Sequence, residues 1–141
     1  RHVKGSSPVR MIIDPSLKLT NRLNIFKDGH KNIVFTQKVT NKKLKNTTIY
    51  QLPKKNFTRC LYKKIIELNF KYILVEGGAT TISNFLEQDL LDIIQFIIAP
   101  IIIGSGIDSI KLKSISNLKY ALRPKSSLYK LGDEMVASLE F

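Results

Sequence analysis

The sequence predicts an α/β protein in which a mostly parallel sheet lies between helices in three layers and ends in an antiparallel C-terminal hairpin. Apolar runs of strand length alternate with segments of helical periodicity through the first two thirds of the chain. Near the end, Gly132 and Asp133 separate two partly alternating segments, as in a hairpin. The 141 residues, 43% of them hydrophobic, suit one ordinary domain, so we expect 1–141 to form a single domain.

The first half of the chain contains three expected strands and a helix. The strands are 9–14, which stops at Pro15, then 32–36, and 47–52, which stops at Pro53. Residues 24–29 indicate a turn or short helical piece, and the lysine-rich segment 38–46 indicates a connector or short helix. An apolar face of helical spacing follows, with Asn56 before it as the expected N-cap. That face consists of Phe57, Leu61, Ile65 and Leu68.

The segment 72–81 is the strongest candidate for a binding site. Its apolar residues 73–75 predict a buried strand, which would place Glu76 at the carboxyl end of that strand. Gly77 and Gly78 can take backbone angles closed to other residues, and they let the main chain approach a ligand. A helix expected from Ala79 would present free N–H groups and a positive dipole end to an anion. A plain tight connection explains the local pattern about as well.

The second half continues with strands at 91–99 and, after Pro100, at 101–106. A weaker strand at 118–131 and a final strand at 134–141 complete the expected sheet. Asp14 and Thr36 close two earlier apolar strands, so they either line a ligand edge or serve as turn and cap residues. Gly104 and Gly106 favour a simple strand end.

Charge and composition restrict the function classes without choosing one. The net charge of +12 would attract nucleic acid, anionic membrane or phosphorylated small molecules, but the lysines are scattered, so we attribute most of the charge to genome composition. The longest apolar stretch, 90–103, is interrupted and too short for a bilayer, and no signal peptide is recognisable. The single Cys60 fits packing and a reducing compartment. We therefore expect a cytoplasmic protein without a membrane partner.

Familiar catalytic constellations are missing from the sequence. His2 and His30 have no companions at metal-ligand spacing, so we expect no metal site. Neither a nucleophile elbow nor a Walker phosphate loop is present. The remaining backbone groups, hydroxyls and Glu76 suit a cofactor that brings its own reactivity, as in hydride transfer.

Five ordered blocks resemble the reductase domain of the bifunctional riboflavin-biosynthesis deaminase/reductase family. They are PVRMIID at 8–14, IVFT at 33–36, LVEGGAT at 74–80, IAPIIIG at 98–104 and GDEM at 132–135. The resemblance implies a dihydrofolate-reductase-like fold, NADPH as hydride donor, and reduction of the ribosyl group of 5-amino-6-(5-phosphoribosylamino)uracil to the ribityl chain. It also implies a homodimer.

Site residues are carried over from this resemblance by position, and no catalytic acid can be named among them. Glu76 and Arg1 would contact the phosphorylated pyrimidine substrate. The cofactor-binding residues would be Pro15, Thr36, Gly78, Ala79, Thr80, Thr81, Ile82, Ser83 and Asn84.

The sequence also departs from the family pattern. A Ser-x-Asp-Gly strand, a helix, and a segment with Gly-x-x-Thr and Asp-Pro normally come first, and they are not found here; nor is the zinc deaminase domain. We therefore expect the chain to be the later part of a reductase domain, and its activity alone is an open question. Two alternatives remain: another dihydrofolate-reductase-like enzyme acting on a pterin or pyrimidine, and a non-catalytic basic module that binds nucleic acid, although charge alone suggests the latter.

Overall fold

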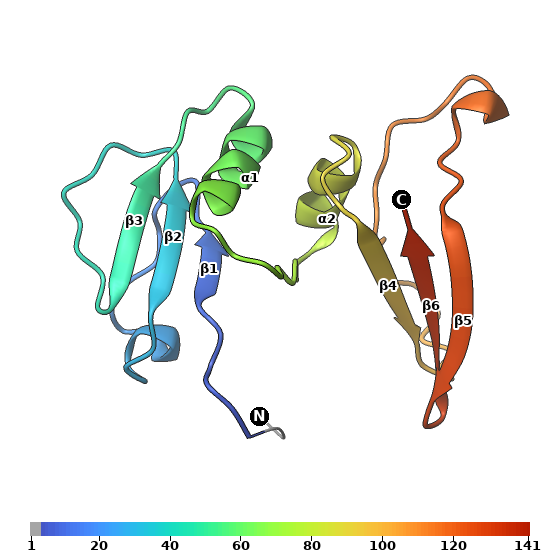
Figure 1. The fold of residues 1–141 in the computed structure, drawn as a ribbon, viewed down its shortest axis with the longest axis horizontal. Helices are drawn as coiled ribbons and strands as arrows, with labels where there is room; N and C mark the ends of the chain where they lie inside the picture. Colours follow the sequence, from blue (N-terminus) through green and yellow to red (C-terminus); the bar gives the residue numbers. More distant parts are fainter. Residues whose placement is uncertain (1–3) are drawn as a thin grey trace. The chain divides into compact units, whose positions relative to one another are not determined.

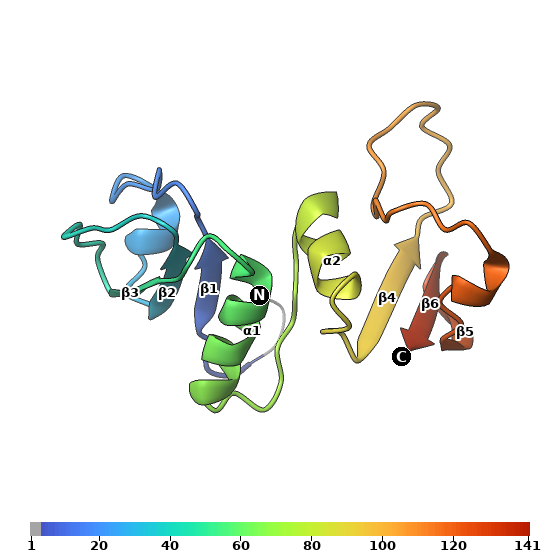
Figure 2. The ribbon, with the colours of Figure 1, turned by 90° about the horizontal axis from the view of Figure 1, so that it is seen from above.

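The structure, a computed structural model, describes residues 4–141 and divides into two compact units, Arg1–Phe70 and Lys71–Phe141. The elements of both are labelled in Figure 1 and seen from above in Figure 2. None of the helices within residues 4–141 has the length and apolar character needed to cross a membrane.

The first unit is built on a parallel sheet of three strands in the order β1-β2-β3. The strands are β1 (Arg10–Ile13), β2 (Asn32–Thr36) and β3 (Thr47–Gln51). All three were expected from the apolar runs, and the structure confirms them. A 3-10 helix, Asn24–Phe26, also agrees with the sequence, while residues 38–46 form a connector without a helix.

Both faces of this parallel sheet are covered, which explains why β2 is buried along its whole length. On one face Phe26, Val34 and Leu44 form a buried cluster with partly buried neighbours from β1, from β3 and from the segment between β1 and β2. On the other face, Phe35 stacks on Tyr50 with ring centroids 5.9 Å apart. Helix α1 (Phe57–Glu67) lies alongside that face, as both views show (Figures 1 and 2). Its Lys64 ammonium lies 5.0 Å from the centroid of the Tyr50 ring.

Asn56 is the N-cap residue of α1, as the sequence predicts, but its side chain does not cap the helix. Asn56 directly precedes α1, but its backbone is left-handed, with φ of 56°, and its side chain makes no capping hydrogen bond. Side-chain caps normally need an extended backbone at this position. Only its main-chain carbonyl contributes, by accepting the N–H of Cys60 at 3.0 Å.

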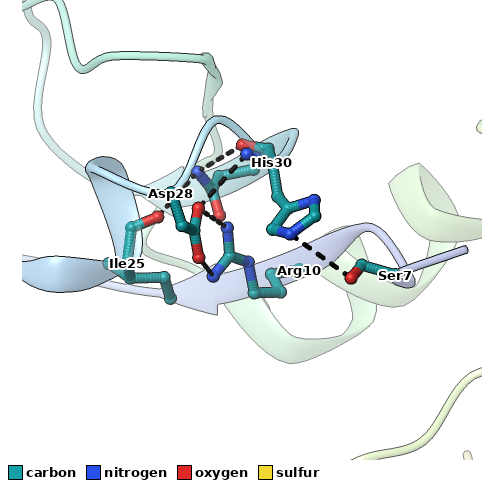
Figure 3. A network of polar contacts seen from close by, with 6 residues as sticks. Ser7, Arg10, Ile25, Asp28 and His30 are labelled. Carbon is teal, nitrogen blue, oxygen red and sulfur yellow. Dashed lines mark hydrogen bonds and ion pairs between the residues drawn. The ribbon is translucent and has the colours of Figure 1, made fainter. Parts of the chain in front are cut away.

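A polar network ties the start of β1 to the loop before β2 (Figure 3). The Arg10 guanidinium donates two hydrogen bonds to the Asp28 carboxylate, at 2.6 and 2.7 Å. These bonds from Arg10, followed by a backbone bond from His30, hold the pKa of Asp28 well below its usual range. Ser7 Oγ lies 3.4 Å from the His30 ring, and the buried Asn32 donates to the His30 carbonyl. The network fixes the amino-terminal end of the sheet.

The second unit contains an antiparallel sheet in the order β4-β6-β5, made of β4 (Ile93–Ile98), β5 (Lys125–Leu131) and β6 (Glu134–Glu140). The C-terminal hairpin is confirmed, with Gly132 at φ of 64° in its turn. Helix α2 (Ala79–Leu86) begins where the sequence predicts. The strand expected over 118–131 is shorter than predicted, because 118–120 form a 3-10 helix that Asn117 caps by accepting the N–H of Lys119.

Two expected strands of this unit do not form. Residues 73–75 and 101–106 are outside both sheets of the described chain, and their apolar side chains are exposed except that of Val75, which is half-buried. Leu74 is 82% exposed and Ile102 is fully exposed. A strand requires a neighbouring strand to pair its N–H and C=O groups, and sequence periodicity cannot supply one.

Candidate functional site

The residues singled out in the sequence fall into two places, one in each unit. The first is the carboxyl edge of the parallel sheet, where β1 and β2 end. The second is the segment from Glu76 to the first turns of α2. The Arg1 prediction lies outside the described residues.

The structure brings Asp14, Pro15 and Thr36 together at the carboxyl edge. The Asp14 N–H donates to the Phe35 carbonyl at 2.9 Å, which continues the ladder by one residue. The buried Thr36 hydroxyl and the Gln37 N–H both donate to the Pro15 carbonyl, at 3.2 and 3.1 Å. The sequence predicted that these residues lie close together, because parallel strands end at a common edge of the sheet.

The polar side chains at this edge also organise the loops. One Asp14 carboxylate oxygen accepts the N–H of Leu19 at 2.9 Å and so closes the turn after β1. The Thr36 hydroxyl accepts the N–H of Lys38 at 3.2 Å. Of the two interpretations left open by the sequence, the turn-forming one is visible in these contacts.

At the start of α2, Gly78 is the N-cap residue with an extended backbone. The N–H of Thr81 donates to its carbonyl at 3.0 Å, so the first turn is well formed. Gly77 and Gly78 can take backbone angles closed to other residues, but neither has a positive φ in the structure. What matters instead is the missing side chain: a Cβ on Gly77 would lie 3.3 Å from the Thr81 Cβ, and one on Gly78 would meet nothing within 4 Å.

The α2 residues proposed for cofactor binding differ in accessibility. Thr80 and Asn84 are exposed, whereas Ala79, Thr81 and Ile82 are half-buried. Ser83 is buried, and its hydroxyl accepts the N–H of Lys111 at 2.7 Å, so it anchors the loop after β4. The main-chain N–H groups of Ala79 and Thr80 come before the first bonded N–H groups of α2, those of Thr81 and Ile82, which both donate to the Gly78 carbonyl.

Glu76 is exposed in the extended segment before α2 and makes no hydrogen bond or ion pair with any residue of 4–141. No contact of the Glu76 side chain with the start of α2 is present that would make it a cap of this helix. Across the same described residues, no group of three or more His, Cys, Asp or Glu side chains is arranged to hold a metal ion.

Sequence reasoning missed Lys42. Its ammonium reaches back to the turn after β1 and donates to the carbonyls of Leu17, at 3.0 Å, and Leu19. It also borders a depression of about 650 Å³ beside β3, together with Lys43 and Gln51. No local signal distinguishes this lysine from the many others in the connector.

Comparison with known proteins decides the family. The sequence model of the RibD C-terminal domain matches residues 1–136. The chain belongs to this family. It is 34% identical over 134 residues to the riboflavin biosynthesis protein RibD of Aquifex aeolicus, covering 92% of this chain and 37% of that protein.

Solved structures show the same dihydrofolate-reductase-like fold of RibD reductase domains. A deaminase/5-amino-6-(5-phosphoribosylamino)uracil reductase from Thermotoga maritima matches with a TM-score of 0.77 at 21% identity, over 99% of this chain and 39% of that one. The riboflavin biosynthesis reductase of Saccharomyces cerevisiae matches with a TM-score of 0.71 at 23% identity, over 95% of this chain and 69% of that one. The chain thus spans well under half of the length of these RibD relatives.

Proposed function

We propose that this chain is part of an NADPH-dependent reductase that converts the ribosyl group of 5-amino-6-(5-phosphoribosylamino)uracil to the ribityl chain in riboflavin biosynthesis. The observation that carries the proposal is the family match over residues 1–136. Homologous RibD reductase domains are reductases of this pathway. The whole reaction is proposed for the full-length polypeptide that contains this chain.

The start of α2 fits an anionic cofactor group. Gly78 has open space where a side chain would project, so the phosphates of NADPH can approach the main chain closely. Thr80 adds an exposed hydroxyl, and the N–H groups of Ala79 and Thr80 at the positive end of the helix dipole favour negative charge. We assign Gly78 to Asn84 to the cofactor phosphates, with Ser83 acting through its loop contact.

The remaining assignments follow the family positions. Pro15 and Thr36 would lie beside the cofactor, and Glu76 and Arg1 would bind the substrate. NADPH, when bound, supplies the hydride that is transferred to C1′ of the ring-opened, Schiff-base form of the ribosyl group. Glu76 accepts hydrogen bonds from the sugar and orients C1′, because an ionised carboxylate is an acceptor only.

We also propose that 1–141 is one part of a domain whose sheet needs further strands. The unpaired apolar segments at 73–75 and 101–106 support this, since exposed strand-like stretches of this kind invite pairing with another segment. A homodimer would cover additional apolar surface. A cytoplasmic location suits the single, half-buried Cys60.

Cofactor titration tests the proposal against its non-catalytic rival. Nicotinamide fluorescence of NADPH should change saturably with the full-length polypeptide, and Gly78→Val should raise the dissociation constant about tenfold or more by filling the phosphate approach. Gly106→Val is the matched control, since it also faces open space without a positive φ. Equal NADPH affinity in wild type and Gly78→Val would contradict the phosphate assignment. Tight, salt-dependent binding to RNA or DNA without NADPH binding would favour the basic module.

A further inference from the structure

The turn that follows β1 is held from several directions. Within it, the Leu17 N–H donates to the Asp14 carbonyl at 3.0 Å, and the Asp14 carboxylate accepts from Leu19. From β2, Thr36 and Gln37 both donate to Pro15. These bonds leave the carbonyls of Leu17 and Leu19 for a partner from elsewhere in the chain.

Lys42 supplies that partner from more than twenty residues away. The carbonyl of Leu17 lies 3.0 Å from its ammonium, and Leu17 has φ of 52°, a left-handed backbone that is costly for a bulky side chain. Such a conformation persists where surrounding contacts determine it. The Lys42 backbone is itself fixed, because its N–H donates to the Thr40 hydroxyl at 2.9 Å.

The bonding of Lys42 is unusual for a surface lysine. The ammonium pairs with two main-chain carbonyls, and no ion pair is formed with a carboxylate of the described residues. Hydrogen bonds from a charged donor are stronger than neutral ones, so this contact contributes order to the turn. The neighbouring Lys43 makes no such side-chain contact with the residues that the structure describes.

We infer that Lys42 is a positioning residue for the cofactor: it fixes the turn 14–19 and thereby holds Pro15 and Thr36 in the arrangement that receives NADPH. This rests on the proposed function. Lys42 need not touch the cofactor, and its effect should therefore be the same for NADPH and NADH, which differ only in the 2′-phosphate.

The test compares Lys42→Met with Lys43→Met, an equal loss of charge and of a lysine stem at the adjacent position, in the full-length polypeptide. Lys42→Met should raise the dissociation constants of NADPH and NADH alike, about fivefold or more, because both hydrogen bonds from the ammonium to the turn are lost. Amide hydrogen exchange at Leu17 and Leu19, measured without cofactor, should become faster. Lys43→Met should leave the cofactor dissociation constants and the amide exchange rates at their wild-type values. Lys42→Arg should do the same, because arginine retains a charged donor.

Three results would overturn the inference. Unchanged exchange at Leu17 and Leu19 in Lys42→Met would show that the lysine does not hold the turn. Weakened binding of NADPH alone would indicate a direct contact with the 2′-phosphate, for instance from the depression beside β3. Equal effects in Lys43→Met would indicate general charge attraction. If wild type binds neither cofactor, the proposed function fails, and the exchange measurement still decides whether Lys42 orders the turn.

Discussion

The two units use apolar strands in opposite ways. In the first, β2 lies between two strands with both faces covered, and Val34, Phe35 and Thr36 have no exposed surface. In the second, β4 pairs on one side only, and much of its apolar surface remains accessible. Segments 73–75 and 101–106 are equally apolar but pair with nothing described.

This difference indicates that the covered sheet of the first unit determines stability, whereas the exposed segment beside Glu76 serves the reaction. A sheet with covered faces contributes most of its burial energy within its own unit, roughly 25 cal/mol per Å² of apolar area. An unpaired apolar segment contributes little burial energy until another strand pairs with it. Glu76 adjoins such a segment, so we expect changes there to affect turnover, whereas changes in β2 affect folding.

The largest expected effect is on catalysis by Glu76→Gln. Losing a charged acceptor at the substrate should lower kcat/KM about 10²–10³-fold, while the thermal midpoint stays that of wild type because Glu76 makes no hydrogen bond or ion pair within residues 4–141. Steady-state kinetics and thermal unfolding of the full-length polypeptide measure the two quantities. Glu140→Gln, an equal charge change on an exposed residue of β6, serves as the control. A normal rate in Glu76→Gln would remove Glu76 from the substrate site.

The next effect is on stability, in Phe35→Ala. Phe35 is fully buried and stacked on Tyr50, so truncation should cost about 3–5 kcal/mol in the free energy of unfolding. Ile102→Ala, at a fully exposed position, should change this quantity by less than about 0.5 kcal/mol in the 141-residue chain. Urea unfolding measures both.

The same two variants, Phe35→Ala and Ile102→Ala, should also be compared in the full-length polypeptide. If additional strands cover residues 101–106, Ile102→Ala should become destabilising there, and Phe35→Ala should keep its cost. An Ile102→Ala variant as stable as wild type in the full-length polypeptide would contradict the proposed pairing.

The smallest effect concerns the ion pair of Arg10 and Asp28. The folded-state pKa of Asp28 is lowered, so the pair stabilises the fold above the unfolded-state pKa, near 4, and that stabilisation is lost as the pH falls further. Asp28→Asn should lower the thermal midpoint slightly at pH 7, because the pair is partly exposed. The gap from wild type should narrow below about pH 4. Asp133→Asn, in the exposed hairpin turn, should show no such pH dependence.

The sequence alone predicted the elements whose partners are close in the chain or carry strong apolar patterns. The strands 32–36 and 47–52 and the helix start at Ala79 follow from such patterns. It also predicted that Asp14 and Thr36 share an edge, since parallel strands impose this. It could not predict the fate of 73–75, because pairing depends on another strand, or the φ values of Gly77 and Gly78, which the surrounding fold determines. Lys42 escaped notice because its partners lie far back in the sequence.

The reductase assignment itself is tested most directly by following the hydride. The full-length polypeptide would be mixed with 5-amino-6-(5-phosphoribosylamino)uracil and NADPH that carries deuterium at both C4 positions of the nicotinamide, and the product would be analysed by mass spectrometry and NMR. We expect a ribitylamino product with deuterium at C1′. NADPH that remains unoxidised, or a product without deuterium at C1′, would contradict it.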